Sequence, residues 1–207
     1  MFYNSFMSYI IAGLGNPGQE YENTRHNVGR MFVEYLRKKE DFPEWREDKK
    51  LKAVTSEGKV GKGKVLLVEP NNFMNNSGKS LLPLVKNKKA AEQLVVVYDD
   101  LDLPLGTLKV SFNRGAGGHR GLDSVIKLLK TREFTRIRIG TSSATPSGKV
   151  KKPIGEKAVI SFILGKFKPK EMETLKKSFK KALGAVEIIV SEKSPQLGRE
   201  KAMGEVN

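Results

Sequence analysis

Residues 8–37 read SYIIAGLGNPGQEYENTRHNVGRMFVEYLR, and this stretch decides the fold that we expect. Residues 9–12 are apolar and partly β-branched, as in a strand buried on both faces, whereas apolar side chains in residues 28–36 recur at helical spacing. Glycines between them let the backbone turn at the carboxyl end of the strand, where open α/β sheets place their chemistry. The stretch predicts a strand, a loop and a helix, with His26 displayed at that edge.

The glycines of residues 13–18, GLGNPG, also satisfy the G-x-G-x-x-G pattern of dinucleotide-binding folds. That site needs a helix that opens within the glycines and an acidic residue about 20 positions further on. Here a polar loop follows the glycines, and Lys38 stands at that position, inside the helical pattern. The sequence therefore disfavours a nicotinamide or flavin oxidoreductase.

The composition indicates a soluble protein that binds a polyanion. The chain has 207 residues, and 38 Lys and Arg against 23 Asp and Glu give a formal charge of +15, which is typical of proteins that bind nucleic acid. The absence of cysteine excludes disulfides, thiol nucleophiles and thiolate metal sites. We find no signal peptide or membrane span, so we expect a cytoplasmic protein without a membrane partner.

The remaining pattern alternates strands and helices within a single α/β domain, expected over residues 1–190, with residues 191–207 as a frayed tail. Residues 141–157 are poor in apolar side chains and are expected to form a flexible loop or a lid. The expected strands are 51–56, 65–68, 93–98, 107–112 and 137–140; the expected helices are 78–86, 122–130 and 170–190, and 158–164 fits either class.

Several polar side chains follow the predicted strands. Asp99 and Asp100 end the apolar run 93–98, and such a pair could bind Mg²⁺, but the phosphate-gripping loop that usually accompanies that site is missing. We favour a carboxylate that orients His26, although a histidine hydrogen-bonded to nearby backbone is the simpler interpretation of His26 alone. With two histidines in the chain, a His-rich metal site is not expected.

Two further loops carry groups that suit a substrate. Residues 70–78, PNNFMNNSG, offer amides that could hold a water, a carbonyl or a ribose, or the segment could simply cap the next helix. Residues 113–121, NRGAGGHRG, combine arginines with glycines, which allows close approach to phosphate oxygens. A mobile connector explains this second loop equally well.

These blocks occur together in a characteristic order. GLGNPGQEYENTRHNVG, EPNNFMNNSGKS, YDDLDLPLG, GAGGHRG and FTRIRIGTSS resemble the bacterial-type peptidyl-tRNA hydrolase family over nearly the whole chain. The resemblance implies a monomeric single α/β domain with a twisted, mostly parallel mixed sheet flanked by helices. It also implies an enzyme without cofactor or metal that frees tRNA from peptidyl-tRNA by ester hydrolysis.

The resemblance also implies roles for residues at the matching positions. His26 would activate water, Asp99 would orient His26, and Asn75 would stabilise charge or position the water. The substrate-binding residues would be Asn16, Tyr21, Phe73, Met74, Asn75 and Arg120, and the tRNA phosphates would meet Lys109, Arg114 and Arg138.

Arg120 departs from the family pattern, in which an asparagine follows this histidine. Arginine cannot accept a hydrogen bond, so it could not orient water as an asparagine carbonyl does, although it could contact phosphate or ribose. A non-catalytic RNA-binding module on the same scaffold, like the organellar intron-splicing relatives of these hydrolases, is therefore the alternative.

Overall fold

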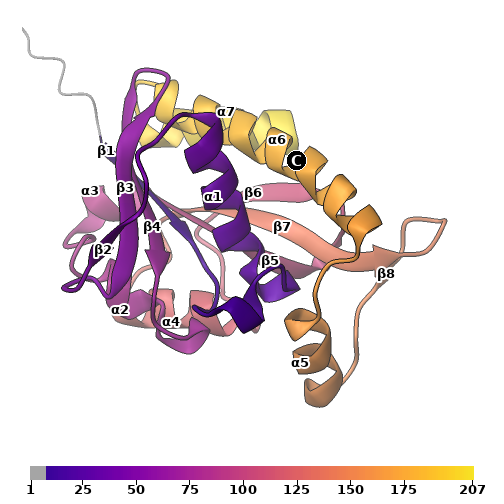
Figure 1. The fold of residues 1–207 in the computed structure, drawn as a ribbon. Coiled ribbons are helices and arrows are strands. Elements are labelled where there is room, and N and C mark those ends of the chain that lie inside the picture. Colours follow the sequence, from indigo (N-terminus) through magenta and orange to yellow (C-terminus); the bar gives the residue numbers. More distant parts are fainter. Residues whose placement is uncertain (1–7) are drawn as a thin grey trace, which may run out of the picture.

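The computed structural model describes residues 8–207, which form one mixed β-sheet with helices on both faces (Figure 1). The sheet order is β2-β3-β4-β1-β5-β7-β6, and β8 pairs with β7. The central strands β4, β1, β5 and β7 are mutually parallel, whereas β2, β3, β6 and β8 pair antiparallel with their neighbours. The expected fold class, a single α/β domain with a mostly parallel mixed sheet, is confirmed.

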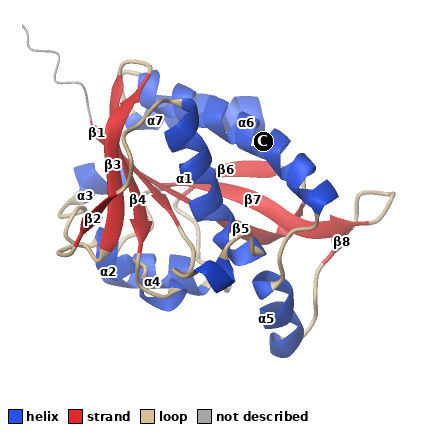
Figure 2. Cartoon of the chain, viewed as in Figure 1, coloured by secondary structure: helices blue, strands red, loops and turns tan. Residues whose placement is uncertain are grey.

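Figure 2 separates the strands from the helices that cover them. The strands are β1 (Ser8–Gly13), β2 (Arg46–Asp48), β3 (Ala53–Val60), β4 (Gly63–Pro70), β5 (Leu94–Pro104), β6 (Leu108–Phe112), β7 (Thr135–Ala144) and β8 (Val150–Lys151). The α-helices are α1 (Val28–Lys39), α2 (Gly78–Leu81), α3 (Lys88–Glu92), α4 (Arg120–Leu129), α5 (Glu156–Leu164), α6 (Pro169–Ser191) and α7 (Pro195–Val206), and the 3-10 turns are η1 (Gln19–Tyr21), η2 (Arg25–Asn27) and η3 (Met74–Asn76).

The core has two parts, one on each face of the sheet. Along β1, Tyr9 and Ile11 pack into a cluster with α1, α6 and α7, whereas Ile10 and Ala12 pack into a second cluster with α2, α3 and α4. This alternation follows from the period of two in a strand. It explains why the central strands read as continuous apolar runs.

A contact between two glycines sets α1 directly against the end of the sheet. A Cβ on Gly29 would lie 2.2 Å from the carbonyl oxygen of Val97 and 2.6 Å from the amide nitrogen of Leu14, and a Cβ on Gly13 would lie 2.4 Å from the carbonyl oxygen of Gly29. Only glycine permits this approach. It brings the turn before α1, which carries His26, to the carboxyl ends of β1 and β5.

The prediction that residues 191–207 are frayed is wrong. Ser194 caps α7 by accepting the backbone N–H of Leu197, Ala202 is fully buried, and the side-chain amide of Asn207 exchanges two hydrogen bonds with Val110 of edge strand β6. This helix buries only small side chains, so it lacks the apolar stripe by which sequence reasoning finds helices.

Two other expectations need correction. Residues 141–157 do not form a loop throughout, because β7 runs on to Ala144 and pairs with β8 before α5 begins. The expected helix 78–86 ends at Leu81, since Pro83 lacks the N–H that a continuing helix needs.

Of the expected domain 1–190, residues 1–7 lie outside the described residues. No helix within residues 8–207 has the length and apolarity to cross a membrane.

Candidate active site

A cleft of about 900 Å³ opens at the carboxyl ends of β1 and β5. Its floor contains Asn16, in the turn after β1, and residues 98–102 of β5. One wall is the loop before α4, and the outer wall is α5, which projects from the main body in Figure 1. Apart from Glu156 at the start of the helix, the α5 side chains that line it are apolar: Val159, Ile160, Ile163 and Leu164. The cleft thus joins a polar floor to an apolar outer wall.

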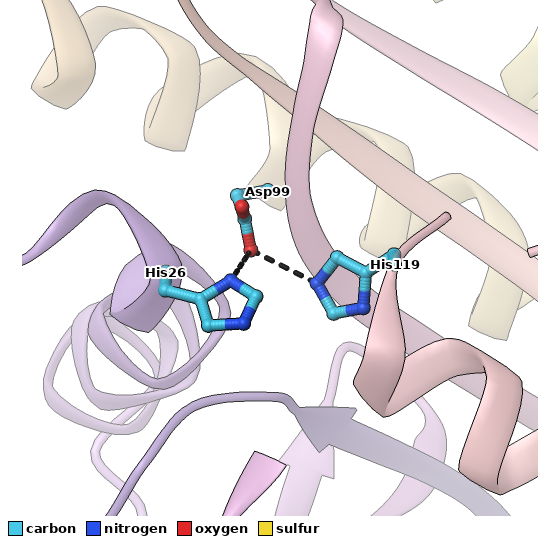
Figure 3. A group of neighbouring side chains, drawn as sticks. All are labelled: His26, Asp99 and His119. Atoms are coloured by element: carbon cyan, nitrogen blue, oxygen red, sulfur yellow. Dashed lines mark hydrogen bonds and ion pairs between the residues drawn. The ribbon is translucent and has the colours of Figure 1, made fainter. Parts of the chain in front are cut away.

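Three buried side chains meet on the cleft floor (Figure 3). Nδ1 of His26, in turn η2, lies 2.9 Å from Oδ1 of Asp99, in β5. Nε2 of His119, the residue that caps α4, lies 3.0 Å from the same oxygen, and the two imidazole centroids are 4.9 Å apart. One carboxylate oxygen therefore joins both histidines of the chain.

Asp99 stays ionised despite its burial. Burial alone would raise the pKa of this carboxyl, but the electrostatic interaction and the hydrogen bonds with the two imidazoles hold the pKa well below its usual range. As an ionised acceptor, Asp99 takes the Nδ1–H of His26. This leaves Nε2 of His26 unprotonated and without a hydrogen-bond partner among residues 8–207, in the orientation that a general base needs.

The same three residues are the one group of potential metal ligands in residues 8–207, with ligand atoms within 4.8 Å of one another. A divalent cation would have to displace the protons that both imidazoles share with Asp99. It would also require a proton on Nδ1 of His119, which already accepts the backbone N–H of Leu122 at 3.1 Å. The hydrogen bonds thus disfavour a metal at this position.

Asn16 is the centre of a buried amide network. Its backbone N–H donates to Oδ1 of Asn27 and its carbonyl accepts from Nδ2 of Asn27, both at 2.9 Å. Its own Oδ1 accepts the backbone N–H of Met74 at 2.8 Å. This leaves the side-chain NH2 of Asn16 as a donor on the cleft lining.

The loop 70–78 supplies the next candidates. Met74 is buried and lines the cleft, whereas Asn75 lies exposed on the rim and Phe73 is 59% exposed. Tyr21 is outside the lining and packs edge-on against Phe73, with centroids 6.4 Å apart. The structure therefore gathers Asn16, Phe73, Met74 and Asn75 at the cleft and places Tyr21 behind Phe73.

The expected phosphate contacts divide between the cleft and the sheet beside it. Arg114 and Arg138 line the cleft, and Nε of Arg138 donates to Oδ2 of Asp100 at 2.6 Å. Lys109 lies outside the lining, directly opposite Arg138 in the β6–β7 pair. Because opposed residues in such a pair share a face, Lys109 continues the basic surface from the cleft over the sheet.

Arg120 lies at the mouth of the cleft. It is 65% exposed in its side chain, and its Nη2 lies 2.7 Å from Oε1 of Glu156 at the start of α5. A second exposed ion pair joins Lys152 to Asp102 at 2.7 Å. Arg120 therefore links α4 to α5 across the mouth of the cleft.

Sequence reasoning assigned no role to His119 or to two buried arginines. Arg136, with no exposed surface, donates to the carbonyl oxygens of Arg114 and Gly115 and so braces the loop before His119. Arg25 braces the turn that holds His26, in contact with Glu171. The available signal was weak: His119 is the second of two histidines and follows a glycine loop, but a buried arginine has no pattern of its own.

Comparison with known proteins agrees with this arrangement. A family model described as peptidyl-tRNA hydrolase matches residues 10–207. The chain is 42% identical over 187 residues to the peptidyl-tRNA hydrolase of Alkaliphilus oremlandii, covering 89% of this chain and 94% of that one, and 43% identical over 180 residues to that of Listeria monocytogenes, covering 86% and 90%.

A solved structure shares the fold over nearly the full length. The crystal structure of peptidyl-tRNA hydrolase from Acinetobacter baumannii superposes with a TM-score of 0.82 at 30% identity, covering 96% of this chain and 94% of that one. Together with the family match over residues 10–207, this similarity decides the assignment. The chain belongs to the peptidyl-tRNA hydrolase family.

Proposed function

We propose that this protein hydrolyses the ester between the peptide and the 3′-terminal ribose of peptidyl-tRNA, and so recycles tRNA from peptidyl-tRNA that ribosomes release prematurely. Family membership supports the reaction class. The observation that carries the assignment of roles is the bond from Nδ1 of His26 to Asp99, which leaves Nε2 of His26 free at the cleft.

In the proposed mechanism, Nε2 of His26 takes a proton from a water molecule as the water oxygen attacks the ester carbonyl carbon. The carbonyl π electrons move to oxygen, and the side-chain amides of Asn75 and Asn16, on the cleft lining, are neutral donors for that charge. When the tetrahedral intermediate collapses, the C–O bond to the ribose breaks. The leaving ribose oxygen takes the proton from Nε2 of His26, which restores the neutral imidazole.

The substrate is expected to lie across the cleft with its RNA end toward the basic surface. Arg114 and Arg138 line the cleft, and Lys109 lies beside Arg138, so these three residues are suited to meet phosphates of the acceptor end. Phe73 and Met74 would contact the acylated end, Tyr21 would support Phe73, and Asn16 would help to distinguish a blocked from a free amino group. With a net charge of +15, affinity for tRNA should fall steeply with salt.

The test compares N-acetyl-aminoacyl-tRNA with unblocked aminoacyl-tRNA and follows release of free tRNA. We expect selective cleavage of the blocked substrate. His26→Ala should lower kcat by about 100-fold or more while the affinity for tRNA stays within a few-fold, because His26 serves the proton transfer rather than binding. Arg46→Ala, an exposed arginine on β2 outside the cleft lining, is the matched control. Full turnover in His26→Ala would remove His26 from the mechanism.

The alternative, an RNA-binding module, predicts tight tRNA binding without release. Arg120 is the one residue of the candidate site that favours it, since an arginine replaces the family's asparagine. We further propose that the enzyme acts in the cytoplasm as a monomer without cofactor or metal. Sedimentation of the free protein tests the monomer, and retention of activity in a chelator tests the independence from metal.

A further inference from the structure

One carboxylate oxygen of Asp99 serves two imidazoles. His26 and His119 approach Oδ1 of Asp99 at 2.9 and 3.0 Å, and the side chains of all three residues are at most 9% exposed. Figure 3 shows His26 and His119 on opposite sides of the carboxylate, each with one nitrogen directed at it. The mechanism above uses His26 and Asp99 and leaves His119 without a role.

The backbone of α4 fixes the tautomer of His119. Nδ1 of His119 accepts the N–H of Leu122 at 3.1 Å, as the N-cap of the helix. A nitrogen that accepts a hydrogen bond carries no proton, so the proton of the neutral ring is on Nε2 and points at Asp99. The capping bond therefore makes Nε2 of His119 the donor toward Asp99.

This assignment separates the two histidines chemically. Both ring nitrogens of His119 are engaged, one by Leu122 and one by Asp99, so neither can take a proton from water. His26 keeps one nitrogen free at the cleft. His119 can therefore influence the reaction only through Asp99.

We propose that His119 is a positioning residue that acts through Asp99: it orients the carboxylate and, by donating to the same oxygen as His26, limits how strongly Asp99 stabilises a proton on His26. The inference rests on the proposed function of His26 as the base. Without the donor on His119, Asp99 would hold the imidazolium form of His26 more strongly, and a larger fraction of His26 would be protonated and inactive near neutral pH.

Apart from Arg114, the other charged or titratable groups around the triad are paired or uncharged. Burial raises the pKa of Tyr98 to about 12, so its hydroxyl stays neutral. Arg25, next to His26, is paired with Glu171. The groups on the surrounding strands, the glycine loop and α5 are the pairs Asp100–Arg138, Asp102–Lys152 and Arg120–Glu156, together with Arg114.

The test uses two substitutions that separate the cap from the donor. His119→Asn keeps a side-chain oxygen to cap α4 but is too short to donate to Asp99, whereas His119→Gln places an amide N–H within reach of Asp99. In His119→Asn we expect the acid limb of the kcat/KM profile to move up by about one pH unit, with about tenfold lower kcat/KM on that limb and an alkaline plateau within a few-fold of the wild type. In His119→Gln, which restores a donor to Asp99, the acid limb should lie close to its wild-type position.

Asp123→Asn is the matched control, because it removes a charge from the first turn of α4 at an exposed position. It should leave the limb in place. An unmoved limb in His119→Asn, or a fall of the plateau alone, would overturn the proposal, since a purely structural role predicts that result.

Nitrogen-15 NMR gives a readout that needs no substrate. The chain has two histidines, so His119→Asn assigns both rings by difference. In the wild type we expect Nδ1 of His119 to be unprotonated and Nε2 to carry the proton, and the titration of His26 should move to higher pH in His119→Asn. A protonated Nδ1 on His119 would refute the inference. Full activity in His26→Ala would instead refute the proposed base while the tautomer of His119 stood.

Discussion

Removal of the Arg25 guanidinium should destabilise the protein strongly, because this one group ties three segments together. Nη1 donates to the carbonyl oxygens of Gly165 and Lys166, both at 3.1 Å, and Nη2 donates to both oxygens of Glu171 at 2.8 and 3.0 Å. The side chain of Arg25 is 10% exposed and that of Glu171 is 25% exposed. The group joins the turn before α1 to the end of α5 and the start of α6.

The magnitude follows from what Arg25→Ala leaves behind. Loss of one partner of a buried ion pair costs about 3–5 kcal/mol, and the partial exposure of Glu171 places the expected loss near the lower end, at about 3 kcal/mol. Arg25→Lys keeps the charge but lacks the planar fork, so its loss should be smaller.

Urea unfolding measured by the fluorescence of the single tryptophan, Trp45, gives both values. Arg46→Ala, exposed on edge strand β2, should change the unfolding free energy by less than about 0.5 kcal/mol. If Arg25→Ala loses less than about 1 kcal/mol with an unchanged m-value, Arg25 does not hold these segments together.

Two further predictions concern charged pairs. Burial raises the pKa of Glu69 from 4.5 to about 7 despite its ion pair with Arg30, so the folded state holds this proton more tightly than the unfolded state. The protonated carboxyl of Glu69 therefore stabilises the folded state at acid pH, and this contribution, up to about 3 kcal/mol of unfolding free energy, is lost as the pH rises to about 7. The urea midpoint should show this decline in the wild type but not in Glu69→Gln. The exposed pair Arg120–Glu156 should show a coupling below about 1 kcal/mol in a double-mutant cycle, vanishing at high salt; a larger, salt-independent coupling would contradict an open cleft mouth.

Much of the fold could be predicted from the sequence because its patterns are local. The strand, loop and helix of residues 8–37 follow from apolar periodicity and glycine, and the run 93–98 reads as a central strand because both of its faces are buried. The helix α7 could not be predicted in this way. It is held by the small residues Gly198 and Ala202 and by the bonds of Asn207 to Val110, which become visible only when β6 is in place.

The site residues that directly follow a strand could be predicted from the sequence. Contacts between residues far apart in the chain could not. His26 and Asp99 could be paired in advance because each leaves a parallel strand at the same edge. Arg136 could not be assigned, because a buried arginine in a strand looks like a surface cation until the loop that it braces is seen. The same holds for Arg25, whose acceptors lie 140 or more positions away in the chain.

The topology of the sheet explains why two histidines meet on one carboxylate. Strand β1 lies between β4 and β5, so the strand order reverses there, and a crevice opens beyond the carboxyl ends of β1 and β5. The helix after β1 covers one face of the sheet and α4 covers the other. His26 therefore reaches Asp99 from one face, and His119, at the start of α4, reaches it from the other. Because the two faces impose different neighbours, one imidazole is capped by a helix backbone and the other keeps a nitrogen free, which is the asymmetry that a single general base requires.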